Sequence, residues 1–321
     1  MTMDFTRILG ATAAGMMLAG AGIAATAFNM AISRKPPLSN EVTEESDLVA
    51  ATMAGARRDG RDWLRSTAHQ RWEIIGHRGV RLAGYYVPAQ ATTHKTVVLL
   101  HGHRADATLM GPFARDYRAR GFNVFLADHR AHGKSGGRYV GLSWLDHLDH
   151  LRWLDRLITE VGPSADIVLH GLSMGGATAL MLGGSPDLPG QVRAVVSDCA
   201  FSSAYDELAH QLRTRHLPAR AVMPLVDLFT RALAGYRLTQ ASPHDAVTRT
   251  PIPVLLIHGG ADAYNPTPMA HELHEANPRT SLWIVPGADH GMSYFTDPDA
   301  YRERVRQFLA PLTHEEPAPA V

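Results

Sequence analysis

Several features that would assign this chain to a common functional class are missing from it. A single cysteine, Cys199, among 321 residues leaves no internal disulfide and no cysteine-based metal cluster. Lysines and arginines balance aspartates and glutamates at 31 each and no basic block stands out, which argues against nucleic acid as a partner. None of the 18 histidines belongs to a His-Glu-x-x-His zinc motif. What remains is a neutral chain with room for one domain of roughly 250 residues.

Charge is also absent from the N-terminal segment. Residues 8–32 carry no charged side chain and are rich in alanine, glycine, methionine and leucine. The run is long enough to cross a bilayer, which needs about 20 helical residues, so it predicts a single-pass N-terminal anchor in the cell membrane. The alternative is a signal peptide cleaved at the small residues Ala25-Thr26-Ala27, which would leave a secreted protein. A buried core helix is disfavoured because the run has no amphipathic pattern.

Composition divides the chain into four parts. Residues 1–33 are the anchor or signal segment, and residues 34–64 read as a polar linker and a leading helix. Residues 65–313 form the main predicted domain, in which the stretch at about 200–248 is too long for a connection and is expected to be a small helical cap. Residues 314–321 are expected to be a loose tail.

Within the main domain, strand-like and helical patterns alternate. The eight strand-like runs are residues 72–75, 80–87, 96–100, 123–127, 167–170, 192–197, 254–258 and 281–285. The later runs are continuously apolar, as in strands buried on both faces of a parallel sheet, while the first two could form an antiparallel hairpin. Residues 143–161 carry a helical stripe of leucines, and His147 and His150 within it are expected to be solvated rather than metal ligands. The alternation predicts a doubly wound α/β sheet.

The most informative motif is Gly171-x-Ser173-x-Gly175, which directly follows an apolar run and precedes a helical stretch of small residues. A serine nucleophile stands above a sheet on a strained strand-to-helix turn, and glycines two residues to either side let the backbones approach. The helix that begins there directs N–H groups at the reaction centre. The spacing therefore predicts Ser173 as a nucleophile.

A serine becomes nucleophilic only when a base takes its proton and a third group orients that base. The candidate base is His290 and the candidate acid is Asp262, each just beyond an apolar strand. Since the carboxyl ends of adjacent parallel strands face one crevice, both can meet Ser173. Asp198, which also ends a strand, remains an alternative acid. His258 is expected to be structural.

Acyl transfer also needs hydrogen-bond donors for the oxyanion that forms at the substrate carbonyl. One expected donor is the backbone N–H of Met174, the residue after the nucleophile. The second is the backbone N–H of His103, in the loop after the third strand, where Gly102 permits a tight turn. The side chain of His101 is expected to brace that loop.

Together these motifs resemble those of the α/β-hydrolases of the serine esterase/lipase type over about residues 70–312. In detail the chain resembles membrane-anchored hydrolases of Gram-positive bacteria and, more distantly, the cinnamoyl and feruloyl esterases. The resemblance implies an α/β-hydrolase fold, with a mostly parallel eight-stranded sheet, helices on both faces and a small helical cap that shapes the pocket. Asn265-Pro266 departs from the Val-Pro of many relatives, which should affect loop packing.

The expected activity is hydrolysis of a small-molecule carboxylic ester through an acyl-enzyme, without a metal or organic cofactor. A thioesterase or a peptidase would use the same residues, so both remain alternatives. Dehalogenases and epoxide hydrolases of this fold use an aspartate nucleophile, which Ser173 argues against. A non-catalytic binding module is disfavoured because no member of the triad is missing from the sequence.

Overall fold

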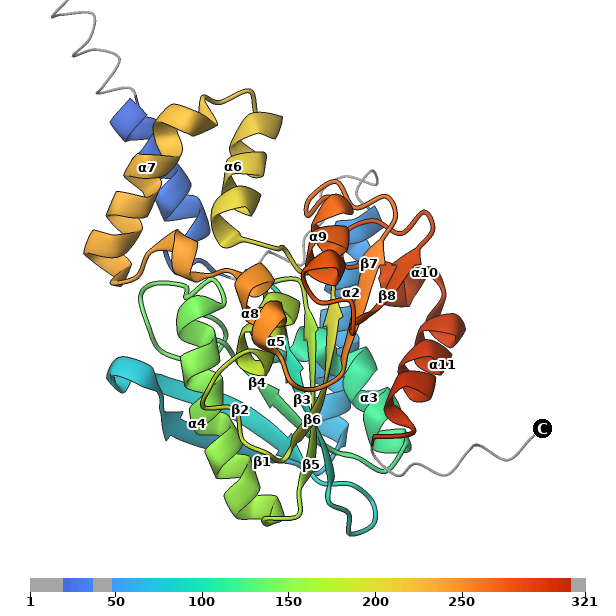
Figure 1. The fold of residues 1–321 in the computed structure, drawn as a ribbon. Coiled ribbons are helices and arrows are strands. Elements are labelled where there is room, and N and C mark those ends of the chain that lie inside the picture. The colour runs from blue at the N-terminus through green and yellow to red at the C-terminus, as the bar shows by residue number, and fades with distance from the viewer. Residues whose placement is uncertain (1–19, 37–47, 313–321) are drawn as a thin grey trace, which may run out of the picture.

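The computed structural model describes residues 20–36 and 48–312 (Figure 1). Its centre is an eight-stranded sheet in the order β1-β2-β4-β3-β5-β6-β7-β8. The strands are β1 Gln70–Ile75, β2 Arg81–Val87, β3 Lys95–Leu100, β4 Asn123–Ala127, β5 Asp166–Leu172, β6 Val192–Asp198, β7 Val254–Gly259 and β8 Ser281–Val285. β2 pairs antiparallel with β1 and β4, and every later pair in the sheet is parallel. The predicted α/β-hydrolase fold, with its mostly parallel sheet, is confirmed.

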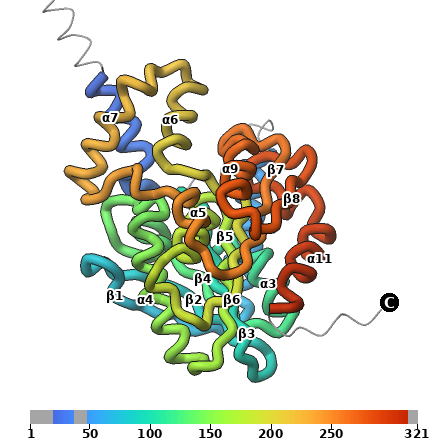
Figure 2. The backbone as a smooth tube through the Cα atoms, in the orientation of Figure 1, coloured from blue at the N-terminus to red at the C-terminus, as the bar shows by residue number. Residues whose placement is uncertain are grey.

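Helices cover both faces of this sheet because each central strand is apolar on both sides (Figure 2). In β3, Val98 and Leu100 face one core while Val97 and Leu99 face the other, as the period of two along a strand requires. On the first face lie α4 Trp144–Val161, α5 Met174–Gly183, α8 Pro243–Arg249 and α9 Pro268–Ala276. On the second lie α2 Leu48–Ser66, α3 Gly111–Ala119, α10 Ser293–Thr296 and α11 Pro298–Leu309.

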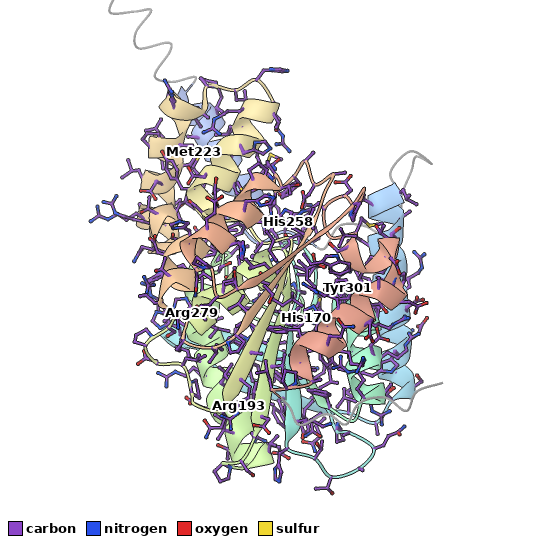
Figure 3. All side chains as sticks on the ribbon, turned by 45° about the vertical axis from the view of Figure 1, so that its right-hand side comes forward. His170, Arg193, Met223, His258, Arg279 and Tyr301 are labelled. Carbon is purple, nitrogen blue, oxygen red and sulfur yellow. The ribbon has the colours of Figure 1, made fainter. Side chains whose placement is uncertain are left out.

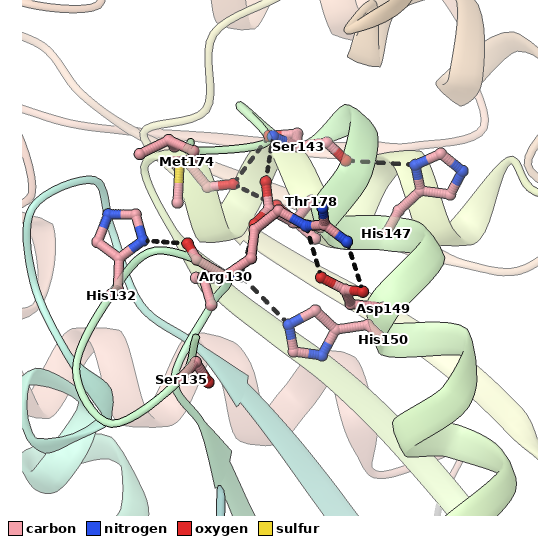
Figure 4. Close-up of polar contacts among 12 residues, drawn as sticks. Arg130, His132, Ser135, Ser143, His147, Asp149, His150, Met174 and Thr178 are labelled. Carbon is pink, nitrogen blue, oxygen red and sulfur yellow. Dashed lines mark hydrogen bonds and ion pairs between the residues drawn. The ribbon is translucent and has the colours of Figure 1, made fainter. Parts of the chain in front are cut away.

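The helix α4 corrects one prediction. His147 and His150 were expected to be solvated, but both are buried, with 6% and 1% of their surfaces exposed. His147 Nδ1 lies 3.3 Å from the carbonyl oxygen of Ser143, and His150 Nε2 lies 3.2 Å from His129 Nδ1 in the loop after β4 (Figure 4). The buried face of α4 is therefore wider than its leucine stripe, because it packs on that loop as well as on the sheet.

Between β6 and β7 the chain forms the cap, which stands above the carboxyl ends of the strands (Figure 1). Its main helices are α6 Ala204–Thr214 and α7 Ala219–Phe229, and a turn of π-helix, Thr230–Ala234, continues α7. Residues 20–31 are helical and lie beside α7, so the beginning of the described chain belongs to the cap in space.

This placement concerns the predicted membrane segment, residues 8–32. Its first part, residues 8–19, lies outside the described residues. In its second part, Ala24, Phe28 and Ile32 are almost fully buried within the domain. Across residues 20–36 and 48–312, no helix combines the length and the apolar character that a bilayer span requires.

Candidate active site

Ser173 occupies a strained turn between β5 and α5. Its backbone has φ +57° and ψ −118°, a conformation that costs a non-glycine residue about 1–3 kcal/mol. Both flanking glycines are needed for close approach. A Cβ on Gly171 would come within 2.1 Å of the carbonyl oxygen of Gly175, and one on Gly175 within 1.9 Å of that of Leu100. The turn is held because the Ser173 N–H donates to the carbonyl oxygen of Asp198 at 2.8 Å.

The three side chains predicted to work together are within hydrogen-bond distance in the structure. His290 Nε2 lies 2.9 Å from Ser173 Oγ, and His290 Nδ1 lies 2.8 Å from Asp262 Oδ2. Because a carboxylate can only accept, the imidazole proton resides on Nδ1, and Nε2 is left to accept the hydroxyl proton of Ser173. This is the geometry in which a serine can be deprotonated as it attacks.

Asp262 is built to stay charged. It is buried, but its Oδ1 accepts the backbone N–H groups of Tyr264 at 3.0 Å and Asn265 at 2.8 Å. Burial alone would raise the pKa of Asp262, yet hydrogen bonds from His258 and His290 outweigh it and lower the pKa to about 2. The carboxylate is therefore ionised at any pH at which a neutral imidazole can act.

His258, expected to be structural, also touches the acid (Figure 3 shows it at the end of the sheet). Its Nε2 lies 2.8 Å from the carbonyl oxygen of Asn265 and 3.3 Å from Asp262 Oδ2. Both partners are acceptors, so Nε2 carries a proton and donates. Burial lowers the pKa of His258, but the contacts with Asp262 and Asn265 reverse this and leave it raised. His258 and Asp262 are four residues apart at the end of a strand, and this spacing could have predicted their contact from the sequence.

Asn265 connects the loop after β7, which carries Asp262, to the residue that follows β6. Its Nδ2 donates to the carbonyl oxygen of Cys199 at 2.7 Å. A valine at this position would lack that hydrogen bond.

The alternative acid, Asp198, is engaged elsewhere. Its carboxylate accepts the hydroxyl protons of Ser293 at 3.0 Å and Tyr301 at 3.1 Å. The Tyr301 oxygen lies 3.0 Å from His170 Nε2, so the contacts continue into the buried core (Figure 3). Burial raises the pKa of Asp198 to about 6, against the lowering effect of these hydroxyls and of the nearby histidines. Asp198 therefore joins the nucleophile turn to the start of α10, close after His290.

Of the two expected oxyanion donors, Met174 directly follows Ser173, and His103 belongs to the loop after β3. Met174 is the first residue of α5, and the N–H groups of a first helical turn have no intrahelical acceptor. The loop that carries His103 passes close to the nucleophile, since a Cβ on Gly102 would lie 3.9 Å from Ser173 Oγ. His101 braces this loop, because its Nδ1 donates to the carbonyl oxygen of Gly102 at 2.7 Å and its Nε2 accepts the His129 N–H at 3.0 Å.

The cap is hydrogen-bonded to the loop after β7 that carries Asp262. From α6, His210 Nε2 donates to the carbonyl oxygen of Ala263 at 3.1 Å, and Gln211 Nε2 donates to that of Tyr264 at 2.9 Å. The Tyr264 ring lies 4.8 Å from the His290 ring and is 43% exposed. Any movement of α6 would therefore reach the rim of the site through Tyr264.

Metal binding would compete with this arrangement. In the described part of the chain, one group of potential ligand atoms lies within 4.8 Å of one another, on Cys199, Asp262 and His290. A bound ion would have to replace the 2.8 Å hydrogen bond between His290 and Asp262. These residues fit a proton-transfer chain better than an ion site.

Comparisons with known proteins identify relatives among the hydrolases and agree with the fold. A family model described as serine aminopeptidase, S33, matches residues 91–225, and one described as TAP-like protein matches residues 234–319. The uncharacterized protein YqkD of Bacillus subtilis is 31% identical over 72% of this chain and 76% of its own length. A monoacylglycerol lipase of Mycolicibacterium smegmatis is 27% identical over 73% of this chain and 94% of its own. The Pyrococcus furiosus esterase Pf2001 superimposes with a TM-score of 0.66 at 22% identity, covering 88% of this chain and 98% of that one.

Proposed function

This chain belongs to the α/β-hydrolase superfamily, and from that premise we propose that it is a serine hydrolase that cleaves carboxylic esters. The observation that carries the proposal is the continuous path from Ser173 Oγ to His290 Nε2 at 2.9 Å and from His290 Nδ1 to Asp262 at 2.8 Å. The lipase and the esterase among the similar proteins support an ester as the bond cleaved.

The proposed reaction has two steps. His290 Nε2 takes the Ser173 proton as Oγ attacks the ester carbonyl carbon, and the N–H groups of His103 and Met174 donate to the oxyanion. The bond to the alcohol breaks, His290 returns the proton to the departing oxygen, and the acyl group remains on Ser173. Water then attacks the acyl-enzyme, His290 takes its proton, and the acid leaves as Ser173 regains a hydrogen. Asp262 holds the imidazole in the productive tautomer throughout, and no step calls on a metal or organic cofactor.

A substrate panel separates this proposal from the alternatives of thioesterase and peptidase, the latter favoured by the name of one matching family. We expect p-nitrophenyl esters of graded acyl length to be hydrolysed, and aminoacyl p-nitroanilides and acyl thioesters to be poor substrates by kcat/KM. A preference for the anilide or the thioester over an ester of the same acyl group would replace the ester assignment.

We also propose that residues 20–32 remain packed against the cap and do not span a membrane. A span by the predicted run would expose Ala24, Phe28 and Ile32 to lipid, and cleavage after Ala27 would remove Ala24 from the packed core. Residues 8–19 alone are too few for a span that needs about 20. Full-length protein is therefore expected to leave membranes in alkaline carbonate, and its mass spectrum should include peptides N-terminal to Ala27. Retention in the carbonate pellet would show instead that the run spans the bilayer.

A further inference from the structure

The end of the N-terminal helix is hydrogen-bonded to the loops that follow β3 and β4. The last carbonyl groups of a helix have no intrahelical donor and need partners elsewhere. The Ala31 oxygen accepts a hydrogen bond from His103 Nε2 at 3.0 Å, and the Ile32 oxygen accepts the Val140 N–H at 2.7 Å. Burial lowers the pKa of His103 to about 3, so its ring is neutral and donates from Nε2. The helix is thus capped by His103, a residue of the loop after β3, residues 101–104, which we call the oxyanion loop.

Arg34 makes a second connection three residues later. Its guanidinium donates to the carbonyl oxygens of Ser135 at 2.6 Å, Gly133 at 2.9 Å and Gly137 at 3.4 Å, and its backbone N–H donates to Arg138 at 2.8 Å. These contacts hold the loop after β4, whereas the contact of Ala31 with His103 holds the loop after β3.

The two loops are themselves linked. His132 Nε2 accepts the backbone N–H of Arg104 at 3.1 Å, while its Nδ1 donates to the carbonyl oxygen of Arg130 at 2.8 Å. Arg130 is held in turn by Asp149 of α4, with both contacts at 2.7 Å (Figure 4). A displacement of residues 133–137 would therefore be passed to residues 101–104 through His132.

Apolar packing holds the segment in place. Ala24 and Ile32 are fully buried, and Phe28 is 6% exposed. The Phe28 ring lies 5.6 Å from the Tyr139 ring and 6.4 Å from the Phe229 ring at the end of α7. One helix face therefore contacts both the cap and the loop after β4, and its position is determined from two sides.

From these contacts we propose that residues 20–36 are a positioning element of the active site, which holds the oxyanion loop through Ala31 and Arg34. The inference rests on the proposed function in taking the His103 backbone N–H as an oxyanion donor. A donor acts on charge that develops only after substrate has bound, so loss of its position should lower kcat more than it raises KM. Displacements of about 1 Å can cost about a hundredfold in rate.

Two pairs of variants in the full chain test the proposal. His103→Phe keeps the backbone N–H and the bulk but loses the ring N–H that meets Ala31, whereas His103→Gln retains a side-chain amide donor. Arg34→Ala removes the contacts with residues 133–137. Lys35→Ala removes the same charge one residue later, and Lys35 has no hydrogen bond or ion pair within the described residues.

We expect kcat for a p-nitrophenyl ester to fall about tenfold or more in His103→Phe and Arg34→Ala, with KM changed less than about threefold. His103→Gln should recover most of the loss, and Lys35→Ala should match the unmodified protein. Hydrogen–deuterium exchange of the amides of residues 101–104 should accelerate in Arg34→Ala and stay unchanged in Lys35→Ala.

The exchange measurement does not depend on catalysis, so it decides the positioning role even if no ester proves to be a substrate. Unchanged exchange of residues 101–104 in Arg34→Ala would overturn the proposal. Equal loss of kcat in Arg34→Ala and Lys35→Ala would overturn it as well, because charge alone would then explain the effect. A fall in kcat in His103→Gln as large as in His103→Phe would show that the hydrogen bond to Ala31 does not position the loop, and would overturn that part of the proposal.

Discussion

Replacing Ser173 with alanine is expected to lower kcat for ester hydrolysis by at least about 10⁴-fold, because it removes the hydroxyl that lies 2.9 Å from His290 Nε2. A fluorophosphonate should label the unmodified protein once per chain, and peptide mapping should place the label on Ser173. Ser185→Ala is the matched control, since the Ser185 hydroxyl accepts the Asp187 N–H at 3.3 Å in the loop that follows α5. Labelling of another residue, or retained activity in Ser173→Ala, would remove Ser173 from the role of nucleophile.

The Tm of the variants distinguishes the loss of the nucleophile from misfolding. Alanine retains a Cβ and the strained φ of +57°, so the Tm of Ser173→Ala should stay close to that of the unmodified protein. Glycine releases the strain, and Ser173→Gly should be equally inactive but melt a few degrees higher. A large drop in Tm in both variants would mean that Ser173 holds the turn rather than performs chemistry.

Much of this architecture could be predicted from the sequence, since its signals are local. A strand buried on both faces has to be continuously apolar, so runs such as 123–127 and 254–258 could be placed within a residue or two. The nucleophile turn has to have glycines at 171 and 175, because any Cβ there meets backbone. The order of serine, aspartate and histidine along the chain then pointed to the strand ends that meet in one crevice.

Contacts between distant segments could not be predicted in this way. The uncharged run before Arg34 is as compatible with lipid as with a protein interior, and nothing within it indicates Tyr139 or Phe229 as partners. Arg34 itself reads as the start of a linker, because its acceptors are backbone carbonyls about a hundred residues away. Burial of His150 likewise depends on His129, which only the folded chain brings to it.

The second large effect concerns the choice between two buried carboxylates. Asp262→Asn is expected to lower kcat by about 10⁴-fold, because an amide can donate to His290 Nδ1 and so favour the unproductive tautomer. Asp198→Asn should cost less than about tenfold, since Asp198 contacts Ser293 and Tyr301 while His290 is bonded to Asp262. The measurement is kcat for one p-nitrophenyl ester in both variants, and the reverse ranking would make Asp198 the acid.

The pH dependence of Tm tests the roles of Asp262 and Asp198 independently of activity, because their pKa values are shifted in opposite directions. The pKa of Asp262 falls from 3.8 to about 2 on folding, so its charge stabilises the fold above pH 4, and this contribution is lost as the pH falls toward 2. Asp262→Asn should therefore lower Tm at pH 7 and have little effect near pH 2. The pKa of Asp198 rises to about 6, so folding favours its protonated form and the charge opposes folding above that pH. Asp198→Asn should lower Tm less at pH 8 than at pH 4, and two variants with parallel pH profiles would contradict the assignment of opposite environments.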